Sequence, residues 1–418
     1  MQPIDRRPIR EMSQRRRHQG LSQIEIHEIE VSLRFVFNLM IHIAAIPILA
    51  LRAPFIFIAL NLLQGVNRMF TVAYQVLDPV NQANRDRLIA SYSDEECWYL
   101  FRFRKAQLTD LFARLNLPQI IRCENKIVCP GEHALLVYMY HLTCPTILLR
   151  MQTEFGRETS QLSRIETEIK RFLIVNYRRF VVGNLLWYED RFEQYADVLN
   201  TKVAYSPVNE VPGTVPRPLH NLVGFLDGSS FPVARISGMN NAQLVFWNGY
   251  YHCHMVLWLG VSLPDSMMIL ENPNPGYMTD PMAWPNSQLN AHMTQINARR
   301  VAQNLGRFRL CGDKIFQPDQ NLFAMYSRRW GPVSPWMTNL NRIISPLRVS
   351  IEWCYGKVKY LFKKLSLKMA QKMMLNNPVE DFILASFFTN CRTCYNWDGP
   401  FRKTFRIPPP TIDDYLNQ

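Results

Sequence analysis

Three acidic residues, each in a distinct local sequence, could together bind divalent metal. Asp227 lies in GFLDGSSFPV, Asp313 in FRLCGDKIF and Glu352 in RVSIEWCYGKVKYLFKKL. Carboxylate oxygens are ligands that Mg²⁺ prefers in proteins. Two such ions roughly 4 Å apart can activate a water and neutralise the leaving oxygen when a phosphodiester is cleaved. The three acids therefore predict a site with two Mg²⁺ or Mn²⁺ ions.

Separate elements must bring these acids together. Asp227 and Asp313 each follow a short apolar run, so we expect each to leave the end of a β-strand. Ser345 and Pro346 have the residue types that open a helix, which predicts that Glu352 lies on a long helix starting there. An apolar face of that helix would pack on the sheet.

Basic residues surround Glu352 on the expected helix. We interpret four of them as contacts to DNA backbone phosphates, namely Arg348, Lys357, Lys359 and Lys363. The simpler alternative is that Glu352 forms an ordinary exposed ion pair with Arg348, worth at most about 0.5 kcal/mol, and that the two aspartates cap turns.

The residue pattern changes near the middle of the chain, which predicts two folded regions. Residues 91–199 show helical spacing and residues 200–220 are a proline-rich connector. Residues 221–396 alternate strand-like and helix-like runs, as in an α/β domain with a mixed sheet, and 397–418 form a tail. The helical region contains a pair at 145–173 that has the layout of a helix-turn-helix, with Ser163 and Arg164 as candidate DNA contacts.

Residues 1–90 carry a basic arm followed by an apolar run at 35–63. Polar residues and prolines interrupt the run, so its continuous apolar pieces are shorter than the roughly 20 residues that cross a bilayer. We therefore expect no membrane span, and a membrane-anchored protein is the less favoured alternative. The basic arm suits phosphate binding or nuclear import.

The net charge of the chain limits the kinds of partner that it is expected to bind. The 418 residues have a formal net charge of +13, and the commonest partner for such an excess is nucleic acid. Nine cysteines at irregular spacing favour a reducing compartment with free thiols. Cys391 and Cys394 resemble half of a zinc site without a second half, and we interpret them as helix-end thiols. The aromatics Trp247, Tyr250 and Tyr251 are expected in the core, with stacking on flipped bases as the alternative.

At these residues the chain resembles the Harbinger group of DDE transposases. The matching positions are Leu226-Asp227-Gly228, the segment from Pro275 to Asp280, Gly312-Asp313 and the frame from Arg348 to Lys359. Two departures are Lys314-Ile315-Phe316, where the family has a small or glycine-containing turn, and Thr279, where a histidine is common. The resemblance covers about residues 95–396.

This resemblance implies a ribonuclease-H-like catalytic domain preceded by an all-helical domain with a helix-turn-helix-like pair. It implies that Asp227, Asp313 and Glu352 are the catalytic, metal-binding triad, with Asp280 as an accessory acid. The implied activity is transposon end cleavage followed by strand transfer to target DNA. Implied partners are DNA, a second copy of the chain and a Myb-like helper protein, in the nucleus. The rival reading is a domesticated regulator that binds DNA without cutting it.

Overall fold

The computed structural model describes residues 84–144, 148–235, 240–366, 372–373 and 377–417. The described residues fall into two compact units. The smaller unit holds 84–86 and 148–162, and the larger holds the rest. The basic arm and the apolar run at 35–63 lie outside the described residues. Among the residues that are described, no helix is long and apolar enough to cross a membrane.

Helices make up most of the described chain before the connector. Its helices are α4 (Asp94–Phe101), α5 (Lys105–Arg114), α6 (Gly131–Thr143), α7 (Leu148–Phe155), α8 (Thr159–Tyr177) and α9 (Phe192–Ala204). An antiparallel hairpin of β1 (Ile120–Arg122) and β2 (Val128–Pro130) stands between α5 and α6 and was not predicted. The first residues assigned to the connector, 200–204, are instead the last turn of α9, which buries Val203 and Ala204.

The two helices of the predicted helix-turn-helix-like pair are α7 and α8. Gly156 follows α7 with φ of +60°, the left-handed conformation that glycine adopts without a Cβ penalty. Its N–H donates to the carbonyl of Gln152 at 2.8 Å, which ends the helix as expected. The start predicted at Pro145 lies outside the described residues.

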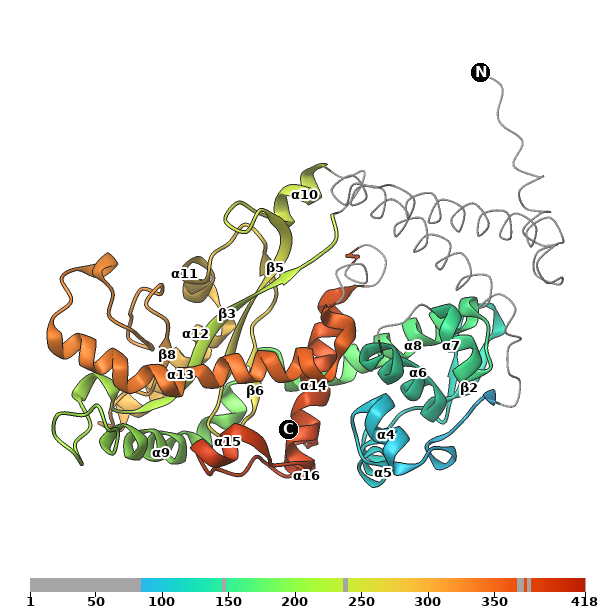
Figure 1. Ribbon diagram of the computed structural model, residues 1–418, viewed down its shortest axis with the longest axis horizontal. Coiled ribbons are helices and arrows are strands. Elements are labelled where there is room, and N and C mark those ends of the chain that lie inside the picture. The colour runs from blue at the N-terminus through green and yellow to red at the C-terminus, as the bar shows by residue number, and fades with distance from the viewer. Residues whose placement is uncertain (1–83, 145–147, 236–239, 367–371, 374–376, 418) are drawn as a thin grey trace, which may run out of the picture. The chain divides into compact units, whose positions relative to one another are not determined.

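A mixed sheet of seven strands forms the centre of the larger unit (Figure 1). Its main path runs β4-β5-β3-β8-β9, and β6 and β7 also pair with β5. Strand β3 is antiparallel to β5 and parallel to β8, and β8 is parallel to β9. The strands are β3 (Leu222–Pro232), β4 (Trp247–Asn248), β5 (Cys253–Ser262), β6 (Met268–Leu270), β7 (Asn274–Pro275), β8 (Arg309–Gly312) and β9 (Leu322–Ala324).

Strand β3 lies inside the sheet because its first half is apolar on both faces. Leu222, Val223, Phe225 and Leu226 are all buried, which is the pattern of a strand covered by helices on both sides. Apolar and β-branched runs in the sequence predict strands around 222–236, 266–272 and 307–316, and β3, β6 and β8 lie within these runs. A fourth such run, 243–263, predicts one strand but is divided into the end of α10, the short β4, a turn and β5.

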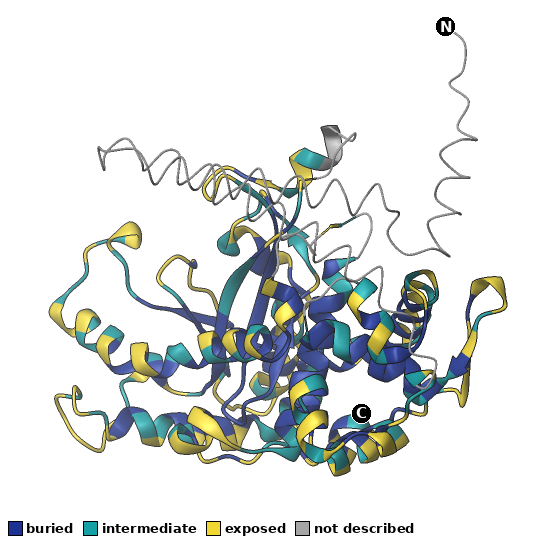
Figure 2. Cartoon of the chain, turned by 45° about the vertical axis from the view of Figure 1, so that its right-hand side comes forward, coloured by how far each residue is buried: buried dark blue, intermediate teal, exposed yellow. Residues whose placement is uncertain are grey.

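Among the described residues of the larger unit, seven α-helices follow β3, and Figure 1 shows α13 running across the sheet. They are α10 (Asn240–Phe246), α11 (Asp280–Ala283), α12 (Gln288–Ala302), α13 (Pro335–Leu361), α14 (Pro378–Tyr395), α15 (Gly399–Thr404) and α16 (Ile412–Leu416). Figure 2 shows the buried residues gathered on the central strands and on the helix faces that cover them.

The predicted start of the long helix at Ser345 is wrong. Helix α13 begins at Pro335, with the Ser334 side chain accepting from the Met337 N–H, and Pro346 lies inside it. An internal proline removes one backbone hydrogen bond and costs about 3 kcal/mol. Burial of Leu340, Ile343 and Ile344 before the proline offsets that cost. The predicted apolar face after the proline is confirmed.

The tail packs into the larger unit through aromatic residues. Tyr415 of α16 stacks with Phe387 of α14 at 6.2 Å between ring centroids, and its hydroxyl lies 3.2 Å from the Asn390 amide nitrogen, which donates to it. Phe401 and Phe405 of the α15 region are buried as well. The last residues therefore belong to the same core as the sheet.

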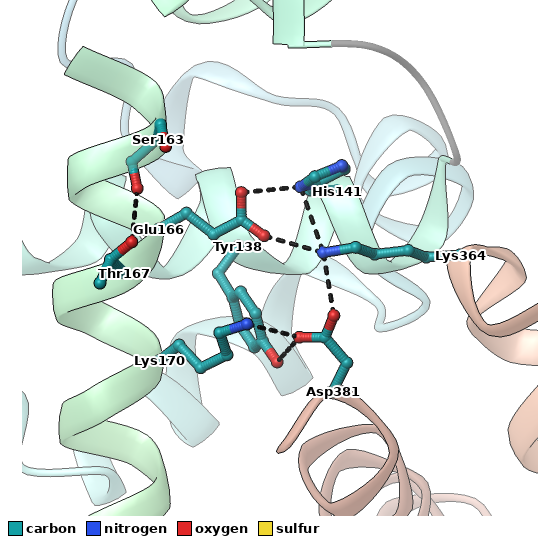
Figure 3. A network of polar contacts seen from close by, with 8 residues as sticks. All are labelled: Tyr138, His141, Ser163, Glu166, Thr167, Lys170, Lys364 and Asp381. Atoms are coloured by element: carbon teal, nitrogen blue, oxygen red, sulfur yellow. Dashed lines mark hydrogen bonds and ion pairs between the residues drawn. The ribbon is translucent and has the colours of Figure 1, made fainter. Parts of the chain in front are cut away.

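A buried charge network joins the helical region to the elements that follow α13 (Figure 3). Lys364, on the short helix η9 (Lys363–Ser366), donates to Glu166 of α8 at 2.8 Å and lies 3.1 Å from Asp381 of α14. Burial alone would lower the pKa of Lys364, but the two carboxylates raise it to about 12. The lysine is thus fixed in its charged form.

Further polar groups satisfy the two carboxylates of this network. Lys170 lies 3.2 Å from Asp381, and the Tyr138 hydroxyl donates to the same oxygen at 3.1 Å. His141 Nδ1 lies 2.8 Å from Glu166. Burial would raise the pKa of Glu166, but Lys364 and His141 outweigh burial and lower it. Each buried charge therefore has an opposite charge beside it, as burial in a low dielectric requires.

Replacing Lys364 by methionine should destabilise the chain strongly, because Glu166 and Asp381 would lose their shared cation while buried. Loss of one partner of a buried ion pair costs about 3–5 kcal/mol. Urea unfolding at neutral pH measures this. The neighbouring Lys363 is exposed, so Lys363→Met is the matched control and should change stability by less than about 0.5 kcal/mol. Equal stabilities of the two variants would contradict a structural role for the network.

Candidate active site

Parallel pairing of β3 with β8 sets two of the predicted acids side by side. Phe225 pairs with Cys311, and Asp227 and Asp313 each follow two residues after that pair. Neighbouring strands lie about 4.8 Å apart, and residues two positions on point to the same face. The two carboxyl groups are near enough that each opposes ionisation of Asp280.

Asp313 directly follows the last residue of β8, as predicted, but Asp227 does not end its strand. Strand β3 continues through Asp227 to Pro232, because β5 pairs with it along that length. Asp227 is opposite Gly260 of β5 in this register. The apolar run ends at Asp227, but the strand continues because its backbone stays hydrogen-bonded to β5 as far as Pro232.

Asp280, the predicted accessory acid, reaches the same place from α11. A Cβ built on Gly228 would meet its carboxylate at 2.0 Å. Glycine at 228 therefore makes room for the Asp280 side chain beside Asp227 on the central strand. This close approach explains why a glycine follows the first acid.

Arg348 joins the third predicted acid to the first. Its guanidinium donates to Asp227 Oδ2 at 3.0 Å and to Glu352 Oε1 at 3.1 Å. The Arg348 side chain is 16% exposed and Glu352 is 55% exposed. The ion pair considered as the simpler alternative is thus present, but the guanidinium also binds a buried strand carboxylate. Asp227, Asp280, Asp313 and Glu352 together with Arg348 are called the acid cluster below.

Tyr355 fixes the helix against the strand that carries Asp227. Its hydroxyl donates to the backbone carbonyl of Asp227 at 3.2 Å. A Cβ on Gly260 would meet this hydroxyl at 2.5 Å, so glycine at 260 permits the approach. Five residues before Tyr355 on α13, the Ser350 hydroxyl lies 3.1 Å from that of Ser262 on β5. These contacts set the depth at which α13 presents Arg348.

Burial and mutual repulsion act on the carboxyl groups of the acid cluster. Burial raises the pKa of Asp280 to about 6, with further increases from Asp227 and Asp313. Burial also raises the pKa of Asp227, and the Arg348 guanidinium offsets only part of that rise. Negative charge in the cluster is therefore incompletely neutralised by the protein itself.

The donor set of the acid cluster fits a divalent cation in kind and in charge. All four acids offer hard oxygen ligands, and the unneutralised charge favours a cation. The side chains as they lie are not a ready-made metal site: within the described ranges, no group of three or more His, Cys, Asp or Glu side chains is placed to hold one ion. Arg348 occupies the space between Asp227 and Glu352, so both acids would have to turn from the arginine to a metal.

The predicted phosphate contacts on α13 do not all face the acid cluster. Lys357 instead donates to the Thr393 hydroxyl of α14 at 2.8 Å, and burial lowers its pKa. That orientation does not suit a phosphate contact, because the helical rotation from 352 to 357 turns Lys357 toward α14. Lys359 is half-buried and burial lowers its pKa. Lys363 lies exposed on η9, with its ammonium 4.8 Å from the ring centre of Tyr360.

The candidate contacts on α8 lie at its surface. Ser163 is exposed, and its carbonyl accepts from the Thr167 hydroxyl at 2.8 Å. Arg164 is half-buried, with its guanidinium beside the side-chain amide of Asn125. Neither residue lies in the acid cluster, so a role in DNA binding by them would be separate from the chemistry.

All nine cysteines are free thiols, and Cys391 is buried on α14. The prediction that the aromatics at 247–251 fill the core is wrong, because Trp247, Tyr250 and Tyr251 are all exposed. They lie on β4 and in the turn that joins β4 to β5.

Sequence reasoning missed two features around the acid cluster. The role of Tyr355 depends on close packing against Gly260, which no spacing along the chain reveals. The loop at residues 326–336 carries exposed arginines and tryptophans next to Asp313. The arginines and tryptophans of this loop can be read from the sequence, but its position next to Asp313 depends on the parallel pairing of β8 with β9.

Residues 226–387 match the family model of the DDE superfamily endonucleases. The matched range includes all four acids of the acid cluster and Arg348. No curated protein matches the chain. No solved structure matches it either.

Replacing Asp280 by asparagine should stabilise the chain at pH 7.5 in EDTA. The folded pKa of Asp280 is about 6 against 3.8 for the free group, so folding costs free energy once the carboxyl ionises. Stability of the native protein should fall as pH rises between these values. The gain for Asp280→Asn should reach up to about 2–3 kcal/mol at pH 7.5 and vanish below about pH 4.

Urea unfolding at pH 4, 5.5 and 7.5 measures this pH dependence. The exposed Asp190 provides a control, since Asp190→Asn should give a small difference at every pH. A gain for Asp280→Asn that does not change with pH would contradict the electrostatic explanation.

Proposed function

We propose that this chain is a transposase-type DNA endonuclease that depends on divalent metal. The observation that carries the proposal is the convergence of Asp227, Asp280 and Asp313 at the junction of β3 and β8, with Glu352 joined to them through Arg348. The match to DDE superfamily endonucleases over these same residues supports it. Asp227, Asp313 and Glu352 are the proposed catalytic and metal-binding residues, with Asp280 as an accessory acid.

When bound, two Mg²⁺ or Mn²⁺ ions would supply an activated water and neutralise charge on the phosphate that is cut. Asp227 and Asp313 would hold them from the sheet and Glu352 from α13. The protein's own contribution is positioning. Tyr355 holds the Asp227 backbone against α13, and Gly228 admits Asp280 beside Asp227, whereas the Asp227 and Glu352 carboxylates would turn from Arg348 to the metal.

Arg348 has a distinct role in this proposal. It balances part of the negative charge that would otherwise repel a phosphate backbone, and it is long enough to turn from Asp227 to a phosphate oxygen. Arginine binds phosphate through two parallel hydrogen bonds. Lys359 on α13 and Lys363 on η9 would extend the basic surface beyond Arg348, whereas Lys357 is turned toward Thr393.

The remaining parts of the proposal rest on resemblance and charge. They are a ribonuclease-H-like domain of the Harbinger type, strand transfer to target DNA, a helix-turn-helix-like pair with Ser163 and Arg164 that helps to bind transposon ends, a homo-oligomer, a Myb-like helper protein and a nuclear location. The net charge of +13 agrees with a DNA partner.

Replacing Asp313 by asparagine should abolish metal-dependent nicking of DNA while leaving DNA binding nearly unchanged. Asparagine keeps the size and shape of the side chain but loses the charge that a hard cation needs. We expect nicking of a labelled duplex with Mg²⁺ or Mn²⁺ to fall by at least about 100-fold. Glu352→Gln should behave in the same way.

Asp197→Asn provides the control, since Asp197 lies exposed on α9 away from the acid cluster. Nicking by Asp313→Asn at the level of the unaltered chain would refute the endonuclease. A chain that binds DNA with strong salt dependence, and never nicks it with either metal, would instead be the non-catalytic regulator.

A further inference from the structure

The segment at residues 326–336, here called the arginine–tryptophan loop, runs from shortly after β9 into the first turn of α13 and exposes two large aromatic rings. Trp330 is 44% exposed and Trp336 is 49% exposed. Leaving such rings in water forgoes free energy that burial would supply. Folding alone therefore gives no reason for two exposed tryptophans within seven residues, and a binding partner does.

The loop has a defined conformation rather than a free one. At its start, Tyr326 and the Asn341 side chain of α13 exchange two hydrogen bonds, each 2.9 Å long. Arg328–Trp330 form a helical turn, η8, whose first N–H groups are capped by Ser327. The Arg329 guanidinium lies 5.1 Å from the Trp330 ring centre. These contacts hold the Trp330 ring in place at low cost in entropy on binding.

Trp330 is tied directly to the acid cluster. Its indole N–H donates to the carbonyl of Lys314 at 3.3 Å, and Lys314 is the residue after Asp313. The edge of the ring is thus anchored one residue from a proposed metal ligand, while much of the ring surface remains open.

Charge around the loop suits a polyanion. From Asn321 to Ile351 the chain contains four arginines, Arg328, Arg329, Arg342 and Arg348, and no aspartate or glutamate. Arg328, Arg329 and Arg342 are exposed. The segment begins shortly after Asp313 and ends at Glu352, so the cationic surface borders the carboxylates directly. Exposed aromatic rings between arginines are the pattern of a surface that binds nucleic acid strands.

We propose that the arginine–tryptophan loop binds an unpaired stretch of DNA strand next to the phosphate that is cut, with Trp330 stacking on a base and Arg328 and Arg329 contacting phosphates. Inside a duplex both faces of each base are covered by the neighbouring bases, whereas an unpaired base leaves a face open to the indole, so the loop favours DNA whose end is opened. This inference rests on the proposed function for the identity of the strand, and it adds the substrate form that the site prefers.

Fluorescence anisotropy on the full chain in EDTA tests the proposal without cleavage. The probes are two labelled duplexes of one sequence, one fully paired and one with three unpaired bases at an end. We expect the unaltered chain to bind the opened DNA more tightly. Trp330→Ala should weaken binding to the opened DNA roughly tenfold and to the paired DNA less than twofold. Trp330→Phe should retain most of the affinity because phenylalanine still stacks.

Two further variants separate stacking from charge. Arg328→Ala with Arg329→Ala should weaken binding to both probes and reduce the slope of log affinity against log salt by about two. Tyr99→Ala removes an aromatic of similar exposure on α4 and should change neither affinity. Fluorescence of 2-aminopurine placed among the unpaired bases should be quenched by the unaltered chain and by Trp330→Phe, but not by Trp330→Ala.

Equal binding of both probes by the unaltered chain, or equal effects of Trp330→Ala on the two probes, would overturn the inference. Circular dichroism of Trp330→Ala shows whether the variant is folded, and Trp330→Phe with the 2-aminopurine signal decides the matter if it is not. Because the assay needs no metal, a chain that prefers opened DNA yet never nicks it would refute the proposed endonuclease and leave this inference standing.

Discussion

The guanidinium of Arg348 links an acid on the central strand to an acid on the long helix, and the arrangement of the candidate site depends on this link. Without a cation between them, Asp227 and Glu352 would repel each other across the strand–helix contact. The charge on Arg348 is also insufficient for the cluster, because burial, Asp227 and Asp313 together still raise the pKa of the Asp280 carboxyl. Arg348 thus holds the acid cluster together but does not neutralise all of its negative charge.

A second group of buried charges shows the opposite balance. Around Lys364, each carboxylate has a lysine at hydrogen-bond distance, and tyrosine and histidine complete the set. Such a network stabilises the association of α6 and α8 with the C-terminal elements and leaves little attraction for an added ion. The contrast between the two groups distinguishes a structural network from a candidate site, although both are built from buried acids and bases.

Much of the site could be predicted from local sequence. The three acids, the accessory Asp280 and the apolar face of α13 each stand in a recognisable frame, and the strands around Asp227 and Asp313 follow from apolar runs. Long-range pairing could not be read in this way. The continuation of β3 past Asp227 depends on β5, the start of α13 at Pro335 depends on burial of residues before an internal proline, and the rotation of Lys357 toward Thr393 depends on α14.

Exposure was the least predictable property. Aromatic residue types are common in protein cores, and a sequence pattern cannot distinguish a ring that fills a core from one that faces solvent. The exposed rings in question are Trp247, Tyr250, Tyr251, Trp330 and Trp336. Their exposure on the unit that carries the acid cluster is consistent with a large ligand that covers both carboxylates and aromatic rings.

Anomalous X-ray scattering from crystals grown with Mn²⁺ tests the central claim most directly. The account predicts an anomalous peak between the carboxylates of Asp227 and Asp313, with Arg348 turned away from Asp227. Crystals that show Mn²⁺ bound elsewhere on the protein, with Arg348 still bridging Asp227 and Glu352 and no peak between the two aspartates, would contradict it.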